Sequence, residues 1–475
     1  MLRFFTNNDM VCKDCKAEEV YKVIASFLSN LEITSMQTVN VEYETDANTY
    51  SAEFQLVPKG GKFFIREVFN DIPLVVNEKL PTVYLVMVNP EYNNYKFYKL
   101  EDAGNEVLAT YGRIGANANE MFGTRTHSYP KRMYYVKLLE KLAKGYKDMT
   151  EIYCPASNKI PEKELPEAKN EPENPNTPSA ILYNMLLQYA KHTVSENLLV
   201  TTVTQQMCDA AEEYIQQLYE QTESTDVEDF NQIYLQLLAV SPRNVRDIST
   251  LLARSSGDYA NIIAKEESLL MAMQAVATKS VVQKKPTADF GPIKVHIATE
   301  KQKAEVMRHL SDNLKNQVVE VYRVINPEHK KRFNDYLKQN NIKKVKQLWH
   351  GSRNENWLSI IQQGLLLKPN AVITGKMFGD GIYFAPSSMK SWGYTSGRGS
   401  YWAKGSQDKC FMGLYATAFG VPYDTTAPQR FTQSFLKTQN KNCVYAHAGS
   451  YLRNDEIIFY DERALLLNYI VEFKA

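Results

Sequence analysis

The stretch LWHGSR, residues 348–353, is the first of four short motifs in the last third of the 475-residue chain. The other three are GDGIYFA at residues 379–385, Lys390-Ser391, and NDE at residues 454–456. One histidine, one tyrosine and one glutamate thus follow in that order, and His350 and Tyr383 each stand close to a glycine. Singly, such residues more often belong to a packed core or an ordinary surface. Four motifs in this order favour a binding site.

Each of these residue types has a physical reason to hold a nicotinamide dinucleotide. Gly351 lets the backbone approach a planar carboxamide, and the Ser391 hydroxyl adds a hydrogen bond to it. Tyr383 and Tyr394 can enclose an aromatic ring while their hydroxyls remain hydrogen-bonded. His350 offers a ring nitrogen to a ribose hydroxyl.

Glu456 is the candidate for the chemical step. Loss of nicotinamide builds positive charge on a ribose carbon, as in glycoside cleavage, and a nearby carboxylate stabilises that charge. The chain has no Gly-x-Gly-x-x-Gly after a strand, which disfavours a Rossmann dehydrogenase. The predicted reaction is transfer of a sugar carbon, with NAD consumed as a substrate.

The block from His350 to Glu456 resembles the catalytic domain of the poly(ADP-ribose) polymerase family, in its His-Tyr-Glu branch. The HGSR, GxGIYFA and Lys-Ser motifs carry the resemblance, together with a glutamate ahead of Tyr460-Asp461. It implies catalytic roles for Glu456, His350 and Tyr383. It also implies NAD contacts from His350, Gly351, Ser352, Tyr383, Lys390, Ser391 and Tyr394.

Two positions depart from the family pattern. Leu366 stands two residues after Gly364, where DNA-dependent members usually have an arginine. Lys376 replaces a tyrosine that is common on the loop over the dinucleotide. The resemblance therefore implies altered contacts on the adenosine side or altered loop closure.

A second resemblance lies upstream. Residues 82–153 predict strands followed by a helix, and YGRIG at residues 111–115 resembles the WGR domain of the DNA-dependent polymerases, with tyrosine in place of tryptophan. Residues 111–147 carry eight Lys/Arg against two Asp/Glu, and we expect the lysines of residues 131–144 on the outer face of a helix. The alternative is a solvated basic helix on an ordinary sheet. The expected DNA-binding residues are Tyr111, Arg113, Lys131 and Arg132.

The chain is predicted to be multidomain. Residues 179–283 hold thirteen Asp/Glu against six Lys/Arg, whereas residues 284–475 hold sixteen against twenty-eight. The acidic part has helical periodicity and resembles, by position, the helical regulatory domain that shields the NAD site in this branch. A helix is also expected at residues 304–324. The predicted parts are an N-terminal α+β module of unknown role (1–80), a β-rich WGR-like DNA-binding domain (82–153), a Pro/Glu linker (154–178), an all-α regulatory bundle (179–283) and an α+β ADP-ribosyltransferase catalytic domain (284–475).

The N-terminal module has a helical pattern at residues 17–30 and alternating stretches at 38–44, 49–57 and 62–69. Its Cys12-x-x-Cys15 lacks a second pair of ligands, so no metal is expected. No run of about 18 apolar residues predicts a membrane span. We expect an intracellular protein, nuclear if the source is eukaryotic, with no membrane partner.

The sequence thus predicts transfer of ADP-ribose from NAD to protein acceptors, itself included, with chain elongation and stimulation by DNA ends or nicks. In this hypothesis, Arg113 or its neighbours couple DNA binding to the helical bundle. Two alternatives remain open: a mono-ADP-ribosyltransferase, and a non-enzymatic DNA-break scaffold whose NAD site is vestigial.

Overall fold

The computed structural model describes residues 1–6, 9–32, 34–59, 62–74, 79–114, 123–154, 176–200, 202–277, 290–367, 377–397 and 408–474. The predicted linker lies almost wholly outside these residues, as does Lys376. The chain divides into two compact units. The first comprises residues 1–165 and 238–251, and the second comprises residues 166–237 and 252–475.

The first unit begins with an antiparallel five-stranded sheet in the order β2-β1-β3-β4-β5. Helix α1 (Val20–Ser29) covers one face because Val20, Ile24 and Leu28 recur at helical spacing and are fully buried against the strands. The alternating stretches form long strands, as their period of two requires. The strands are β1 (Leu2–Phe5), β2 (Met10–Lys13), β3 (Gln37–Glu44), β4 (Thr49–Lys59) and β5 (Lys62–Asn70).

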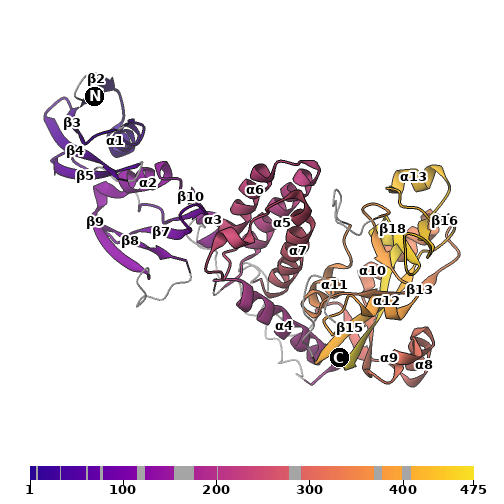
Figure 1. Ribbon diagram of the computed structural model, residues 1–475. Helices are drawn as coiled ribbons and strands as arrows, with labels where there is room; N and C mark the ends of the chain where they lie inside the picture. Colours follow the sequence, from indigo (N-terminus) through magenta and orange to yellow (C-terminus); the bar gives the residue numbers. More distant parts are fainter. Residues whose placement is uncertain are drawn as a thin grey trace. The chain divides into compact units, whose positions relative to one another are not determined.

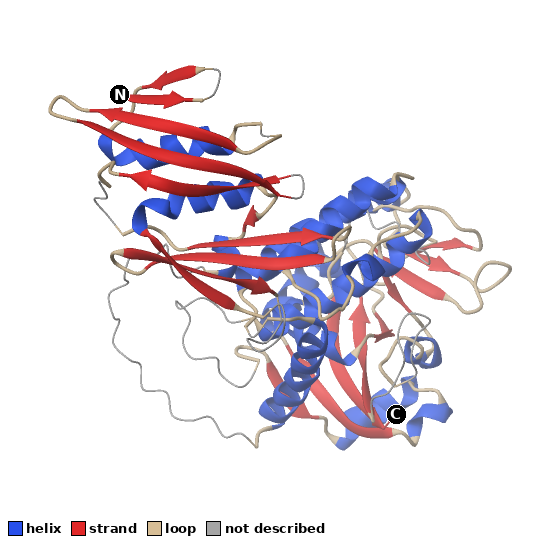
Figure 2. Cartoon of the chain, turned by 60° about the vertical axis from the view of Figure 1, so that its left-hand side comes forward, coloured by secondary structure: helices blue, strands red, loops and turns tan. Residues whose placement is uncertain are grey.

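A second antiparallel five-stranded sheet follows, in the order β10-β6-β7-β8-β9. A Cβ on Gly112 would lie 2.9 Å from the Gly123 carbonyl oxygen, so only glycine lets these two backbones cross. The strands, red in Figure 2, and their helices are β6 (Val83–Asn89), β7 (Asn94–Asp102), β8 (Glu106–Arg113), β9 (Arg125–Pro130), α2 (Tyr134–Ala143), β10 (Lys147–Asp148) and α3 (Thr150–Tyr153).

Helix α2 is shared by the two sheets. It packs against α1, and its Val136 is buried in the core of the first sheet, whereas Tyr134 is buried in the core of the second. The prediction that its lysines lie on the outer face is wrong. Three of them surround the buried carboxylate of Glu140, and burial lowers the pKa of Lys141 to about 8. The nitrogen-to-oxygen distances to Glu140 are 3.1 Å for Lys137, 3.8 Å for Lys141 and 2.5 Å for Lys144.

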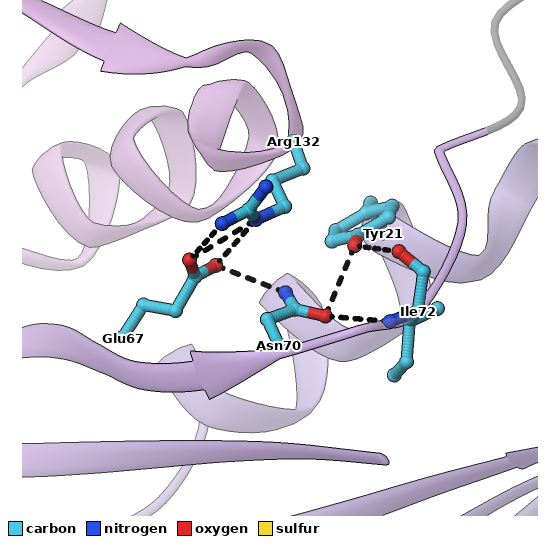
Figure 3. Close-up of polar contacts among 5 residues, drawn as sticks. All are labelled: Tyr21, Glu67, Asn70, Ile72 and Arg132. Atoms are coloured by element: carbon cyan, nitrogen blue, oxygen red, sulfur yellow. Dashed lines mark hydrogen bonds and ion pairs between the residues drawn. The ribbon is translucent and has the colours of Figure 1, made fainter. Parts of the chain in front are cut away.

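A polar chain also joins the two sheets (Figure 3). The Arg132 guanidinium, just ahead of α2, contacts both carboxylate oxygens of Glu67 on β5, at 2.7 and 3.1 Å. The Asn70 amide donates to Glu67 at 2.9 Å, and its oxygen accepts from the Ile72 backbone at 3.0 Å. The Tyr21 hydroxyl donates to the Ile72 carbonyl at 2.7 Å. The N-terminal module is therefore built into the same unit as the WGR-like sheet.

The second unit opens with helices, as the periodicity predicts. Thr177 begins α4 because its hydroxyl accepts from the Ala180 backbone at 3.2 Å, with Pro178 in the first turn. Helix α6 starts in the second unit and its last three residues belong to the first. The long helices are α4 (Pro178–Asn197), α5 (Gln205–Glu220), α6 (Val227–Val240) and α7 (Tyr259–Val276), all visible in Figure 1.

The remainder of the second unit holds a five-stranded sheet, order β11-β12-β19-β15-β13, and a four-stranded sheet, order β14-β18-β17-β16. Its helices are α8 (Glu300–His309), α9 (Asp312–Lys315), α10 (Pro327–Gln339), α11 (Trp357–Gln363), α12 (Ser388–Trp392) and α13 (Gln433–Thr438). Its strands are β11 (Lys294–Ile297), β12 (Val318–Ile325), β13 (Lys346–Gly351), β14 (Ile382–Phe384), β15 (Lys409–Thr417), β16 (Pro422–Thr425), β17 (Cys443–Ala446), β18 (Glu456–Phe459) and β19 (Leu465–Lys474).

The expected helix at residues 304–324 is wrong in its second half. Helix α8 ends at His309, and residues 318–325 form β12 instead. This stretch is rich in valine, and it pairs with β19 on one side and β11 on the other. Pairing on both edges outweighs a helical reading of the same apolar residues.

The Arg132–Glu67 contact gives a stability prediction for the first unit. Glu67→Gln leaves the guanidinium facing a neutral amide, and we expect a loss of about 1–2 kcal/mol. Amide hydrogen exchange in α1 and β5 measures this loss of stability, and exchange should be faster in the variant than in the wild type. Glu44→Gln, which removes the more exposed carboxylate beside Arg3, is the matched control and should change little. Equal exchange in the two variants would contradict the predicted role of this contact.

Candidate active site

The four motifs meet where the two sheets of the second unit join. The backbones of Trp349 and Ala385 exchange two hydrogen bonds of 3.1 Å, which ties the end of β13 to the end of β14. Strand β14 then pairs with β18, so Tyr383 lies opposite Ile458, two residues after Glu456. The structure therefore brings His350, Tyr383 and Glu456 to one region of the fold.

His350 is held in one orientation. Its Nδ1 lies 3.2 Å from the Tyr383 carbonyl oxygen, which can only accept, so Nδ1 carries the proton and Nε2 is left as an acceptor. The rings of Trp357, Phe384 and Tyr415 surround the imidazole at centroid distances of 6.4, 5.5 and 6.2 Å. Burial among them lowers the pKa of His350 to about 4, so the ring is neutral at physiological pH.

Gly351 lies against the backbone of α12. A Cβ at this position would come within 1.9 Å of the Ser391 carbonyl oxygen, so no other residue fits without moving the strand. The Ser391 hydroxyl donates to the Trp349 carbonyl at 3.0 Å, which fixes α12 to β13. Ser352 follows, and its hydroxyl accepts from the Asn356 amide at 3.1 Å.

The two tyrosines differ in what they contact. The Tyr383 hydroxyl donates to the Gly379 carbonyl at 2.9 Å and accepts from the Phe378 backbone at 3.1 Å, so it braces the turn that precedes β14. Burial raises the pKa of this hydroxyl, which therefore keeps its proton. Tyr394 is 56% exposed and presents a ring face that a planar ligand can cover.

Glu456 begins β18 and is 8% exposed. One carboxylate oxygen, Oε1, forms an ion pair with the Lys390 ammonium, which also lies 3.3 Å from the Asn454 carbonyl oxygen. The other oxygen, Oε2, is buried and has no hydrogen-bond partner among the described residues. A buried carboxylate oxygen is costly to leave unpaired. Glu456 Oε2 is therefore suited to accept a hydrogen bond from a hydroxyl of a bound sugar.

The residues expected to bind DNA all lie in the first unit, and each contacts the protein. Tyr111 stacks on Tyr98 at 5.6 Å. The Arg113 guanidinium donates to the Asn93 carbonyl at 2.7 Å and lies 3.4 Å from the Arg246 carbonyl oxygen. Lys131 pairs with Asp102 at 2.8 Å, and Arg132 pairs with Glu67.

Of the two departures from the family pattern, Leu366 is exposed after α11, and Lys376 is outside the described residues. Sequence reasoning missed Asn356, Phe384 and Tyr415, which surround the His350–Ser352 segment. Nearness to the motifs could have pointed to Asn356 and Phe384. Tyr415 in particular is 65 residues from His350 and meets it only through the pairing of β13 with β15.

Within the described part of the chain, no cluster of three or more His, Cys, Asp or Glu side chains is arranged to hold a metal, and Cys12 and Cys15 are free thiols. The helices in that part of the chain include none that is long and apolar enough to cross a membrane.

Comparison with known proteins finds two matching domains in this chain. The poly(ADP-ribose) polymerase catalytic domain matches residues 296–411, and the WGR domain matches residues 82–152. His350 and Tyr383 fall inside the first range, whereas Glu456 lies beyond its end. The chain is 28% identical over 163 residues to the putative poly(ADP-ribose) polymerase-like 100L of Invertebrate iridescent virus 6, a match that covers 33% of this chain and 86% of the viral protein.

Two cellular relatives match shorter shares of their own length. The poly(ADP-ribose) polymerase of Drosophila melanogaster is 29% identical over 225 residues, which is 42% of this chain and 21% of that protein. Human poly(ADP-ribose) polymerase 2 is 58% identical over 48 residues, which is 10% of this chain and 8% of the human protein.

These matches define the class: the chain carries the catalytic domain of an NAD⁺ ADP-ribosyltransferase. More particularly, it joins a poly(ADP-ribose) polymerase catalytic domain to a WGR domain, and the resemblance seen in its sequence is confirmed.

The lowered pKa of His350 gives a pH prediction. A base whose pKa falls from about 6.5 to about 4 on folding stabilises the folded state above pH 6.5, and this stability is lost as the pH falls towards 4. Between pH 7 and pH 5 the loss is on the order of 1–2 kcal/mol. Glutamine at this position does not titrate. We therefore expect urea unfolding of the wild type to weaken more, over this interval, than unfolding of His350→Gln.

Tryptophan fluorescence is a suitable probe for this experiment because all four tryptophans lie at residues 349–402, in the catalytic domain. If the wild type and His350→Gln lose the same stability between pH 7 and pH 5, protonation of His350 is not the cause of that loss.

Proposed function

We propose that this protein transfers ADP-ribose from NAD to protein acceptors, itself included, that it elongates the product into chains, and that DNA ends or nicks stimulate it. The observation that carries the proposal is the Oε2 oxygen of Glu456. It is buried, has no hydrogen-bond partner in the described part of the chain, and belongs to a carboxylate that Lys390 already holds by its other oxygen. The proposed setting is intracellular, and nuclear in a eukaryote.

In this proposal each side chain has a role in NAD cleavage. The backbone of Gly351 binds the nicotinamide carboxamide, and the exposed ring of Tyr394 covers the nicotinamide. The Nε2 of His350, which does not contact the Tyr383 carbonyl, accepts a hydrogen bond from a hydroxyl of the adenosine ribose. Glu456 accepts a hydrogen bond from a hydroxyl of the nicotinamide ribose. It also stabilises the positive charge that develops as nicotinamide leaves.

Chain elongation rests on the same carboxylate. By resemblance to the family, a glutamate at this position is typical of members that extend chains, whereas an apolar residue is common in members that add a single unit. A carboxylate can accept the proton of an incoming ribose hydroxyl, and an apolar side chain cannot. The mono-ADP-ribosyltransferase is therefore the second candidate, distinguished by product length.

Stimulation by DNA is supported by contacts within the first unit. Arg113, in the YGR motif, and Asn93 both bind the Arg246 carbonyl, at 3.4 and 2.9 Å. Residue 246 follows the end of α6. The last carbonyls of this helix accept from two hydroxyls of the WGR-like domain: Tyr95 donates to Leu238, and Tyr153 donates to Ala239 at 2.7 Å. Movement at the YGR motif would therefore act on α6.

Contacts within the second unit extend this path towards the NAD site. The Ser268 hydroxyl of α7 lies 3.4 Å from the Asn356 side-chain oxygen, and the Asn356 amide donates to Ser352 in the HGSR motif. Arg430 lies between two carboxylates, 3.5 Å from Glu223 after α5 and 3.5 Å from Asp380 in the GDG turn. These contacts support a helical bundle that restrains the catalytic domain until DNA binds.

Helix α4 is an exception within this bundle. Its Leu182 and Leu186 are fully buried in the same core as Trp357 and Ile361 of α11. Burial of each leucine contributes about 1.5–3 kcal/mol. Helix α4 therefore belongs to the catalytic core, and only α5–α7 are suited to act as a removable restraint.

The catalytic proposal predicts the behaviour of Glu456→Gln. With labelled NAD and a nicked duplex, we expect the wild type to release nicotinamide at least about tenfold faster than without DNA and to form a ladder of products on a gel. Glu456→Gln should lose chain growth by roughly a hundredfold and keep some NAD cleavage. His350→Ala should lose both.

The outcomes of this experiment separate the alternatives. Unchanged labelling by Glu456→Gln would exclude its catalytic role. A single added unit in the wild type would support the mono-ADP-ribosyltransferase. Absence of any nicotinamide release by the wild type, with and without DNA, would support the non-enzymatic scaffold.

The restraint is tested by deleting residues 202–277, which removes α5–α7 and keeps α4 in the core. We expect nicotinamide release without DNA to rise at least about fivefold, because the contacts to Asn356 and Arg430 are lost. The same deletion in the Glu456→Gln background is the control and should not gain activity. An unaltered requirement for DNA would refute the restraint.

A further inference from the structure

The face of the four-stranded sheet opposite Glu456 carries a connected set of side chains. Ala446 of β17 pairs directly with Glu456 of β18, so these two side chains share one face. Tyr445 belongs to the other face, and it lies beside Asp424 of β16 in the parallel register. The rear staple, as we call it, consists of Asp424, His447, Tyr445 and Asp455.

Each link of the rear staple is a direct contact. The His447 Nε2 donates to Asp424 Oδ1 at 2.7 Å. The imidazole stacks on the Tyr445 ring, with centroids 4.3 Å apart and planes 23° from parallel. The Tyr445 hydroxyl donates to Asp455 Oδ2 at 2.9 Å, and Asp455 Oδ1 accepts from the Ala448 backbone at 2.8 Å. The staple therefore runs from β16 to the residue that precedes Glu456.

The protonation states of Tyr445 and Asp455 are fixed near neutral pH. Burial raises the pKa of Tyr445 to about 12, so its hydroxyl remains a donor. The hydrogen bond from the Ala448 backbone holds the pKa of Asp455 below its ordinary value, and Tyr445, His447 and Lys390 add to the effect. Asp455 is thus a charged acceptor of two hydrogen bonds, the stronger kind of such contacts.

Residues 454–456 are also held from the other face of the sheet. Lys390 on α12 contacts both the Asn454 carbonyl and the Glu456 carboxylate. Asp455 lies between these two residues and is held from behind by Tyr445 and the Ala448 backbone. The segment 454–456 is therefore fixed from two sides, which sets the direction of the unpaired Glu456 oxygen.

We propose that Tyr445 and Asp455 are positioning residues for Glu456, and that the His447–Asp424 pair holds the Tyr445 ring in place for this role. The inference rests on the proposed catalytic function of Glu456. Neither residue touches the substrate. A displacement of about 1 Å at a catalytic group can lower a rate by roughly a hundredfold, so loss of the staple acts on turnover. NAD binding is affected little, because His350, Gly351 and Tyr394 come from other elements.

The test measures kcat and KM for NAD, and the ratio of transfer to NAD hydrolysis, with the full chain and a nicked duplex. Tyr445→Phe removes one hydroxyl and should lower kcat about tenfold, with KM within about twofold of the wild type. Asp455→Ala removes both hydrogen bonds and should lower kcat further. In both variants the ratio of transfer to hydrolysis should fall. Transfer to an acceptor depends on the direction of the Glu456 carboxylate more than NAD hydrolysis does.

Two variants serve as controls. Asp455→Asn keeps an oxygen for the Ala448 backbone and a polar partner for Tyr445, so it should recover kcat to within about threefold of the wild type. Tyr451→Phe alters an exposed tyrosine in the same loop and should leave kcat unchanged. Unfolding followed by tryptophan fluorescence checks that all variants are folded.

Glu456→Gln, measured alongside, separates the inference from the function on which it rests. If Glu456→Gln is impaired while Tyr445→Phe and Asp455→Ala keep the wild-type kcat, the positioning role is wrong and the catalytic role stands. A raised KM with unchanged kcat in these two variants also overturns it. If Glu456→Gln equals the wild type, the catalytic proposal itself fails.

Discussion

The site depends on one close approach, between the backbone of Gly351 and the carbonyl of Ser391. Any side chain at position 351 would come within 1.9 Å of that oxygen. Because the two backbones touch, the end of β13 and helix α12 are fixed together, and the Ser391–Trp349 hydrogen bond secures them. His350 and Lys390 lie on these two segments, and Tyr394 follows α12 by two residues. The relative positions of these residues therefore depend on Gly351. The position of Glu456 depends on it too, through the ion pair with Lys390.

Glu456 reaches the same site by a different route. It begins a strand whose pairing with β14 and β17 is fixed by buried apolar residues such as Ile457 and Ile458. Lys390 holds its carboxylate from the front, and the rear staple holds the preceding residue from behind. One carboxylate oxygen is left without a hydrogen-bond partner among the described residues, although other buried carboxylates are paired. Glu140 with its three lysines in the first unit is an example of such pairing.

The sequence predicted the catalytic domain, the WGR domain and the helical region, because short motifs and periodicity are local properties. It failed where a distant segment decides the structure. Lys137, Lys141 and Lys144 contact Glu140, which also accepts from the Ile65 backbone of the N-terminal sheet. Residues 318–325 form a strand because β19, nearly 150 residues later, pairs with them. The rear staple joins residues 424 and 455, which no spacing rule relates.

In the proposed mechanism, a hydroxyl of the nicotinamide ribose of NAD donates a hydrogen bond to the Oε2 oxygen of Glu456. A crystal structure of the full chain with a non-hydrolysable NAD analogue would test this hydrogen bond. We expect a distance of about 2.6–3.0 Å between Glu456 Oε2 and that hydroxyl, with the carboxamide on the Gly351 backbone. A dinucleotide bound elsewhere, or a Glu456 oxygen more than about 5 Å from the ribose, beyond any hydrogen bond, would exclude this binding mode.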